Sequence, residues 1–225
     1  LAAAMQDYDR ALIVGSMSTY GKGTVQTIVN LDDYVNGGSE IKPLGQIKLT
    51  TQKYYRINGD ATQLKGVIPD VILPDEYNKI KVGEKDYEHS MAWDKIEAVN
   101  YKTWDQPVSP QLDELRRRSS QRVQASATFS LIAENADRFK ARREREEFPL
   151  SLKAFQSDVA AQKKESDRFR DIRKTIEGMD VSFLSADMDY IYADETRTQR
   201  FETWQKNLRK DIHLYETIQI MQDMK

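Results

Sequence analysis

The stretch STYGKGTVQTIVNL, Ser18 to Leu31, combines the tightest turn of the N-terminal region with its clearest strand pattern. Lys22 lies between two glycines, which permit tight backbone geometry and the close approach of another chain. The residues that follow alternate in polarity, so that Val25, Thr27 and Val29 would share one face of a strand. The stretch therefore predicts a turn that presents one lysine just before a β-strand.

The chain begins with the helix-forming stretch LAAAMQDY, and strand-like runs lie before and after the turn. Ala and Leu are strong helix formers. By contrast, ALIVG (Ala11–Gly15) is typical of a short buried strand, and GQIKLTTQKYYRING alternates again. The Gly37-Gly38 pair predicts a loop over Asp32–Glu40, between the two alternating runs. We therefore expect residues 1–76 to form a mixed α/β unit.

Beyond Pro110 the pattern becomes helical. Ser109 and Pro110 suit the start of a helix, and apolar residues then recur at helical spacing. The final run places one set of apolar residues on a single helix face: Phe201, Trp204, Leu208, Ile212, Tyr215 and Ile218. We predict an α+β chain, in which residues 1–76 are α/β, residues 77–109 form an irregular connector and residues 110–225 form a mostly α-helical domain.

Composition and charge exclude several kinds of site. The 225 residues carry a net charge of −2 and no cysteine, which excludes disulfides, thiolate catalysis and cysteine metal sites. His89 and His213 lie far apart in the sequence, which argues against a histidine metal site. Acids interleave with bases in Arg138–Phe148, so we expect a solvated helix face there, whereas Arg116–Arg122 is the best candidate for contact with an anion. We expect no metal, no cofactor and no nucleic-acid partner.

The chemistry of Lys22 depends on its environment. A free lysine has a pKa of about 10.4 and is protonated at neutral pH. Burial disfavours the charged form, lowers the pKa and lets a neutral lysine act as general base for a serine nucleophile. Gln26 lies four residues on, where its amide oxygen can accept from the amine and hold it in place. The alternative is a solvated turn lysine, which the spacing alone favours.

Several ordered motifs in residues 1–75 resemble one protease family. They are the helix LAAAMQDYDRA, the strand LIVG, the turn YGKGTVQ and the segment that ends in KGVIPDVILP. Together they resemble the C-terminal processing proteases, also called tail-specific proteases, which are serine peptidases with a Ser–Lys dyad. The segment MAWDKI, Met91–Ile96, is similar to the larger periplasmic members, which continue into a long helical C-terminal region as this chain does.

The resemblance implies roles for three residues. Lys22 would be the general base, Gln26 would orient it, and Asp7 aligns with an acid that the larger members carry near the dyad. The nucleophilic serine of the family precedes the helix that begins here at Leu1. We therefore expect this chain to be the C-terminal part of a longer protein and to be inactive by itself. The residues Met17-Ser18 are an insertion relative to the turn of the family.

The resemblance also implies a setting and partners. We expect a periplasmic endopeptidase that cleaves unfolded or tail-exposed proteins near their C-terminal tail, with an adaptor protein as a further partner. The alternative function is a non-catalytic binding or scaffold module, in which the helical region from Pro110 onward docks a protein partner. A serine just upstream of Leu1 would favour the protease, and an alanine or glycine there would favour the binding module.

Overall fold

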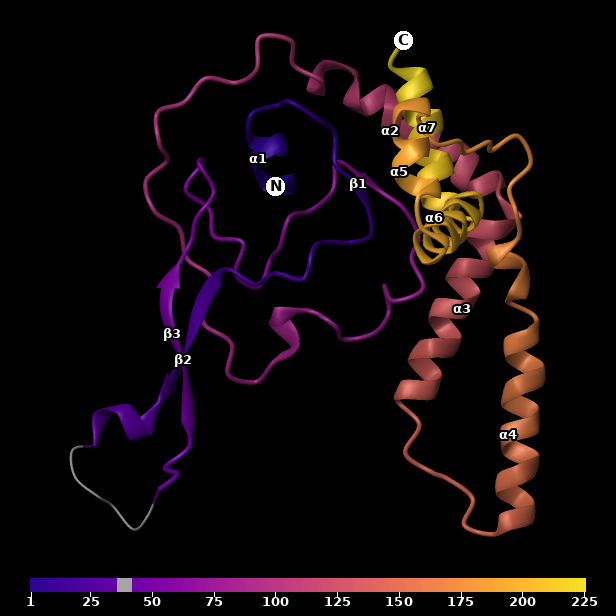
Figure 1. The fold of residues 1–225 in the computed structure, drawn as a ribbon, viewed down its shortest axis with the longest axis horizontal. Helices are drawn as coiled ribbons and strands as arrows, with labels where there is room; N and C mark the ends of the chain where they lie inside the picture. Colours follow the sequence, from indigo (N-terminus) through magenta and orange to yellow (C-terminus); the bar gives the residue numbers. More distant parts are fainter. Residues whose placement is uncertain (36–41) are drawn as a thin grey trace. The chain divides into compact units, whose positions relative to one another are not determined.

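The computed structural model describes residues 1–35 and 42–225, which form two compact units (Figure 1). Unit 1 comprises Leu1–Ile13, Met17–Asp70 and Lys81–Ser109, and unit 2 comprises Val14–Ser16, Val71–Ile80 and Pro110–Lys225. Short strands belong to the first part of the chain and helices dominate the second, so the predicted α+β class is confirmed. No helix within the described ranges has the length and apolar character needed to cross a lipid bilayer.

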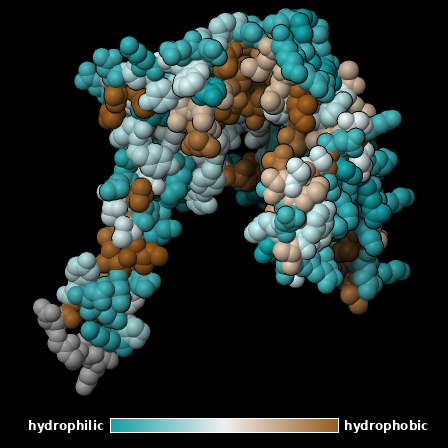
Figure 2. Space-filling view, turned by 45° about the horizontal axis from the view of Figure 1, so that its top comes forward, coloured by the Kyte–Doolittle hydropathy of each residue, from teal (hydrophilic) through white to brown (hydrophobic). Residues whose placement is uncertain are grey.

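A two-stranded antiparallel ribbon is the main regular element of unit 1. β2 (Thr24–Asn30) pairs with β3 (Gln46–Lys53), and a bulge between Val25 and Gln26 shifts the register. Most residues of both strands are exposed, and Figure 2 shows apolar side chains on the surface of this arm. The alternating pattern of the sequence therefore predicted the ribbon correctly.

The predicted loop over Asp32–Glu40 is described only in its first half. Residues Leu31–Tyr34 form a 3₁₀ helix, and the side chain of Asn30 caps it by accepting from a backbone N–H of its first turn. Gly37 and Gly38, on which the prediction rested, lie outside the described residues.

The helix α1 (Ala2–Asp7) opens unit 1, as the alanine-rich start predicts. A six-residue helix is marginal alone in water, so contacts with the rest of the unit must stabilise it. Gln6 supplies two of them, because its Nε2 donates to the Ile68 carbonyl at 3.0 Å and to Asp70 Oδ1 at 2.8 Å. α1 is thereby anchored to the chain segment that follows β3.

Residues 81–109 contain little regular structure, yet they pack onto the rest of unit 1 and belong to it. Their backbone pairs with the segment after β3: the Ile96 N–H donates to the Gly59 carbonyl at 2.9 Å, and the Ala61 N–H donates to the Asp94 carbonyl at 3.2 Å. Ala61, at this pairing, is only 2% exposed. The stretch is therefore part of the wall of unit 1 and not a separate linker.

Unit 2 contains two very short strands. β1 (Val14–Gly15) pairs in parallel with β4 (Val71–Ile72). The predicted strand over Ala11–Gly15 is wrong for its first three residues. The Ile13 N–H donates at 2.8 Å to the Asp70 carboxylate, a side chain, where a strand would bond to a neighbouring backbone.

Helices build the remainder of unit 2, as the helical spacing predicts. They are α2 (Leu112–Ala125), α3 (Ala127–Arg143), α4 (Leu152–Asp167), α5 (Met188–Tyr192), α6 (Glu195–Leu208) and α7 (Ile212–Asp223). Side chains that are at most 2% exposed form the core of the unit: Leu73, Leu115, Ile132, Ala136, Ile191 and Ile220. Four helices have a side-chain cap at the N-terminus, which satisfies free N–H groups of the first turn: Ser126 for α3, Ser151 for α4, Asp194 for α6 and Asp211 for α7.

The final helical run differs from its prediction. The sequence placed the apolar residues between Phe201 and Ile218 on one helix face, but α6 ends at Leu208 and a separate helix, α7, begins at Ile212. Asp211 causes the break, because its Oδ1 accepts from the His213 and Leu214 N–H groups at 3.0 Å each and so starts a second helix. The single face is therefore divided between two helices.

The predictions for the two charge-rich stretches also need correction. Arg138–Phe148 was expected as one solvated helix face, but α3 ends at Arg143. Beyond that end, Arg145 donates to Asp158 of α4 at 2.8 Å. The arginines of Arg116–Arg122 lie on α2 and pair with acidic residues of this chain, so their charge already has partners.

Candidate active site

Glycine geometry and backbone contacts hold the turn around Lys22. Gly21 has a φ of +90°, which L side chains rarely adopt. A Cβ on Gly23 would lie 2.5 Å from the backbone nitrogen of Gln63, so that only glycine fits there. The Lys22 carbonyl accepts from Thr62 Oγ1 at 3.0 Å. The main chain of the lysine is thus fixed from both sides, and its side chain is only partly buried.

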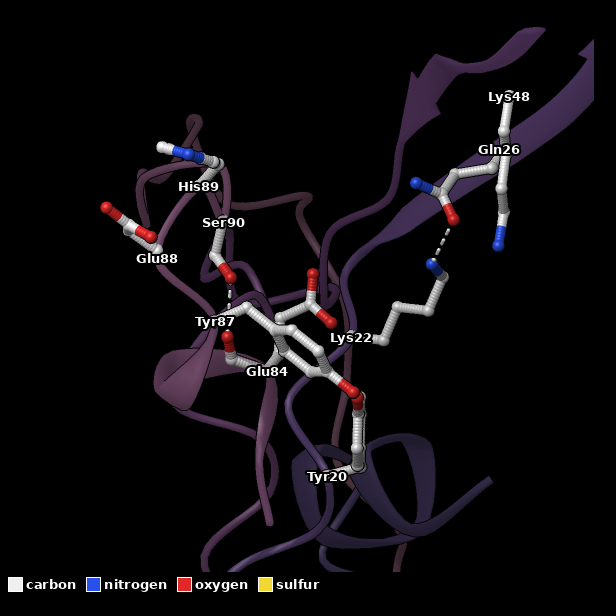
Figure 3. Close-up of a pocket in the computed structure, with 9 residues that line it drawn as sticks. All are labelled: Tyr20, Lys22, Gln26, Lys48, Glu84, Tyr87, Glu88, His89 and Ser90. Atoms are coloured by element: carbon white, nitrogen blue, oxygen red, sulfur yellow. Dashed lines mark hydrogen bonds between the residues drawn. The ribbon is translucent and has the colours of Figure 1, made fainter. Parts of the chain in front are cut away.

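Lys22 and Gln26 are in direct contact, as their four-residue spacing in the sequence suggested. The Nζ of Lys22 donates to Gln26 Oε1 at 2.9 Å, the dashed line on the right of Figure 3. Gln26 lies in β2 immediately after the bulge, and its side chain is exposed. The contact sets the direction of the amine, and the catalytic roles of the two residues stay predictions.

The Asp7 carboxylate bonds to Arg56 and Asn58 and not to Lys22 or Gln26. It accepts from Arg56 through Nε at 2.9 Å and through Nη2 at 2.5 Å, and from Asn58 Nδ2 at 3.1 Å. Only 5% of the Asp7 side chain is exposed, and its contact raises the pKa of Arg56. In this structure Asp7 holds α1 to the turn after β3. Asp7 lines one cleft together with Lys22 although its bonds run to Arg56 and Asn58, and its role beside a dyad stays a prediction.

The start of α1 and Lys22 line one cleft of about 460 Å³. Its walls are mostly apolar or aromatic and include Leu1, Ala2, Ala3, Tyr54, Tyr55, Ile57 and Val67. This volume lies within the usual range for small ligands or for part of a peptide. The first residues of α1 and Lys22 therefore border the same space.

Lys22 and Gln26 also line a second cleft, of about 540 Å³ (Figure 3). Lys48 of β3 stands beside Gln26, and the opposite wall comes from one loop: Glu84, Tyr87, Glu88, His89 and Ser90. A hydrogen bond with Tyr87 raises the pKa of Tyr20 to about 12. The cleft therefore has lysines along one wall and two carboxylates along the other.

Sequence patterns missed the residues that support the turn. Thr62, Gln63 and Leu64 each bond to one residue of the glycine–lysine–glycine turn. No pattern in the sequence marked these three residues, and a single glutamine beside Leu64 was the available signal. The loop over residues 84–90 carries no pattern at all, because its place at the cleft depends on long-range contacts.

Histidine and acidic residues do not gather into a metal site in this structure. Within residues 1–35 and 42–225, no three side chains of His, Asp or Glu lie together in a way that could hold a metal ion. The polar side chains that line the two clefts are suited to binding and to proton transfer: amines, carboxylates, hydroxyls, one amide, one imidazole and one guanidinium.

Comparison with known proteins gives the family. Residues 77–225 match the family described as "C-terminal domain of tail specific protease (DUF3340)", and residues 1–73 match "Peptidase family S41". A tail-specific protease of Haemophilus influenzae is 44% identical over 100 residues, which are 44% of this chain and 14% of that protein. A carboxy-terminal-processing protease of Bartonella bacilliformis is 36% identical over 92 residues, which are 38% of this chain and 19% of that protein.

The matched stretches thus span less than a fifth of either relative. The S41 match covers the turn, the ribbon and both residues of the Lys22–Gln26 contact, whereas the C-terminal match covers the loop over residues 84–90 and all the helices from α2 onward. The chain belongs to the tail-specific protease family, and it joins a segment of the S41 peptidase domain to the C-terminal domain of that family.

Proposed function

We propose that Lys22 is the general base of a Ser–Lys endopeptidase in the full-length protein, with a nucleophilic serine on a residue that precedes Leu1. One observation carries this proposal. Lys22, whose amine donates to Gln26 at 2.9 Å, lines the same cleft as the start of α1. A serine a few residues before α1 would therefore present its hydroxyl to the space that Lys22 faces.

In the proposed reaction, the amine of Lys22 accepts one proton and gives it back in each half of the cycle. Neutral Lys22 accepts the serine hydroxyl proton while Oγ attacks the peptide carbonyl carbon, and the resulting ammonium gives that proton to the leaving amine. In the second half, Lys22 takes a proton from water as the hydroxide adds to the acyl ester, and returns it to the serine Oγ. Gln26 Oε1 accepts one N–H of the amine throughout, which keeps the reacting position of Nζ toward the cleft.

The substrate we propose is an extended polypeptide segment close to the C-terminal tail of an unfolded or tail-exposed protein. The names of the two relatives, tail-specific and carboxy-terminal-processing, support this position of cleavage. The two clefts that meet at Lys22 support an extended chain, because such a chain can pass along both. A periplasmic setting and an adaptor protein are further parts of the proposal.

The first experiment locates the nucleophile. The full-length protein is treated with a serine-directed covalent reagent, and the labelled residue is found by mass spectrometry. We expect one label upstream of Leu1, with loss of cleavage of an unstructured protein in proportion to labelling. The 225-residue chain alone should take no label and cleave nothing. Cleavage by that chain alone, or cleavage by a fully labelled protein, would contradict the proposal.

The second experiment tests the orienting contact. Gln26→Ala in the full-length protein should lower kcat on the order of tenfold to a thousandfold, because the amine stays but loses the bond that directs it. Gln52→Ala is the matched control, since it removes an exposed strand glutamine of the same ribbon that lines neither cleft. Equal kcat values for the two variants would argue that the Lys22–Gln26 contact has no part in catalysis.

A further inference from the structure

Gln63 is a fully buried amide that bonds to the turn of Lys22. Its exposed fraction is 0%. Its Oε1 accepts from the Gly23 N–H at 2.8 Å, and its Nε2 donates to Glu84 Oε1 and to the Met91 carbonyl at 3.1 Å each. Both N–H groups and the oxygen of the amide are therefore used. A glutamine buried to this degree needs such partners, because an unbonded amide in the interior is costly.

The partners also fix which way the amide lies. Rotating it by half a turn would place the –NH₂ group against the Gly23 N–H, and the amide oxygen against a carboxylate and a carbonyl. Every one of these contacts would then be repulsive. The orientation with Oε1 toward Gly23 is thus the one that the surroundings allow.

Three consecutive residues hold the three residues of the turn. Besides the Gln63–Gly23 bond, the Leu64 N–H donates to the Gly21 carbonyl at 2.8 Å, and Thr62 Oγ1 donates to the Lys22 carbonyl at 3.0 Å. The side chain of Gln63 also reaches beyond the turn and bonds to the loop over residues 84–91. That loop forms the acidic wall of the cleft in Figure 3.

We propose that Gln63 is a positioning residue for the reaction, which fixes the turn of Lys22 against the loop over residues 84–91 and so sets where the amine points. The inference rests on the proposed function of Lys22. Gln63 itself touches no reacting atom, since its polar atoms all bond to protein groups. A small shift of the turn would displace Nζ from the nucleophile, and misplacement by about 1 Å can cost about 10² in rate.

The test uses Gln63→Met in the full-length protein, because methionine has a similar length and no hydrogen-bonding amide. We expect kcat to fall about 10²-fold with little change in KM, and the peptide that contains Gly23 to exchange its amide hydrogens faster. Asn135→Leu is the matched control. Asn135 is also a buried amide, only 3% exposed, and it bonds to Glu76 at 2.5 Å in unit 2. Its loss should lower thermal stability and leave kcat unchanged.

A second variant pair covers the case in which methionine prevents folding. Gln63→Glu alone places two carboxylates together, whereas Gln63→Glu with Glu84→Gln exchanges donor and acceptor between these two side chains and keeps an oxygen for the Gly23 N–H. The exchange still loses the bond to the Met91 carbonyl, so the rate should return only in part. We expect the exchange to restore kcat to within about tenfold of the parent. Parental kcat in folded Gln63→Met, or an exchange variant as slow as Gln63→Met or Gln63→Glu, would overturn the inference. A parental rate in Lys22→Ala would instead overturn the proposed function, so the two failures are distinguishable.

Discussion

Lys22→Ala in the full-length protein is expected to abolish tail-directed proteolysis, with a fall in kcat of at least about 10²–10⁴. Alanine cannot accept the serine proton, and no other amine in the described residues bonds to Gln26. The fold should persist, because the bonds that hold the turn use its backbone groups and not the Lys22 side chain. The Lys22 carbonyl that accepts from Thr62 is still present in alanine.

Two further variants sharpen this test. Lys22→Arg should fail as completely as alanine, since a guanidinium stays protonated in proteins and cannot serve as a base. Lys102→Ala is the control, because Lys102 is an exposed lysine of the same unit that lines neither cleft, and it should keep the parental rate. The cleavage rate is measured on an unstructured substrate, with circular dichroism to verify folding and a binding assay to verify peptide affinity.

A near-parental rate in folded Lys22→Ala would leave Lys22 as a solvated turn lysine. The alternative of a binding or scaffold module would then take precedence. The helix α4 would be the first place to examine for a partner, because none of its residues is buried and its apolar side chains Leu152, Phe155 and Val159 are exposed.

Local patterns predicted the elements whose causes are local. Alternation predicted the ribbon, and a four-residue spacing across a glycine turn predicted the Lys22–Gln26 contact. Asp211 shows a local signal that was present but not used, since an aspartate before an apolar helical run is a common N-cap. Treating Asp211 as an N-cap would have predicted two helices, α6 and α7, in place of one.

Long-range contacts explain what the sequence could not predict. Gln63 bonds to residues 40, 21 and 28 positions away, and no periodicity relates them. The same holds for Asp9, whose carboxylate accepts from Ser109, 100 residues on. Two-residue strands such as β1 and β4 exist only because they pair with each other, so propensity cannot reveal them. The residues that support the candidate site are mostly of this kind.

Arg122→Met is expected to destabilise unit 2 by about 2–4 kcal/mol, because it leaves a buried carboxylate without its cation. Arg122 of α2 donates to both oxygens of Glu216 on α7, at 2.8 to 3.1 Å, and to Asp223 Oδ2 at 2.7 Å. The Glu216 side chain is only 3% exposed. We expect a smaller loss of stability than for a fully buried ion pair, because the Arg122 side chain is 31% exposed and water partly screens its charge.

The measurement is urea unfolding of the 225-residue chain, followed by far-ultraviolet circular dichroism because helices dominate unit 2. Arg117→Met is the matched control on the same helix. Arg117 pairs with Glu114, both side chains are about half exposed, and its loss should change stability little. The double variant Arg122→Met with Glu216→Met should recover most of the loss, because it removes the buried charge together with its partner. A double variant as unstable as Arg122→Met would show that packing, and not the unpaired carboxylate, is responsible.

The second partner of Arg122, Asp223, predicts a dependence on pH. The Arg122 guanidinium lowers the pKa of Asp223 below its ordinary value of 3.8. A carboxylate whose pKa is lowered by folding stabilises the folded state above its unfolded pKa, and this contribution is lost as the pH falls through the folded value. The parent therefore loses that contribution in acid, whereas Arg122→Met lacks the part that Arg122 supplies at every pH and keeps only the weaker contact of Asp223 with Arg118. The difference in unfolding free energy between the two proteins should accordingly shrink as the pH falls below 3.8, and a constant difference would contradict the role of the Arg122–Asp223 pair.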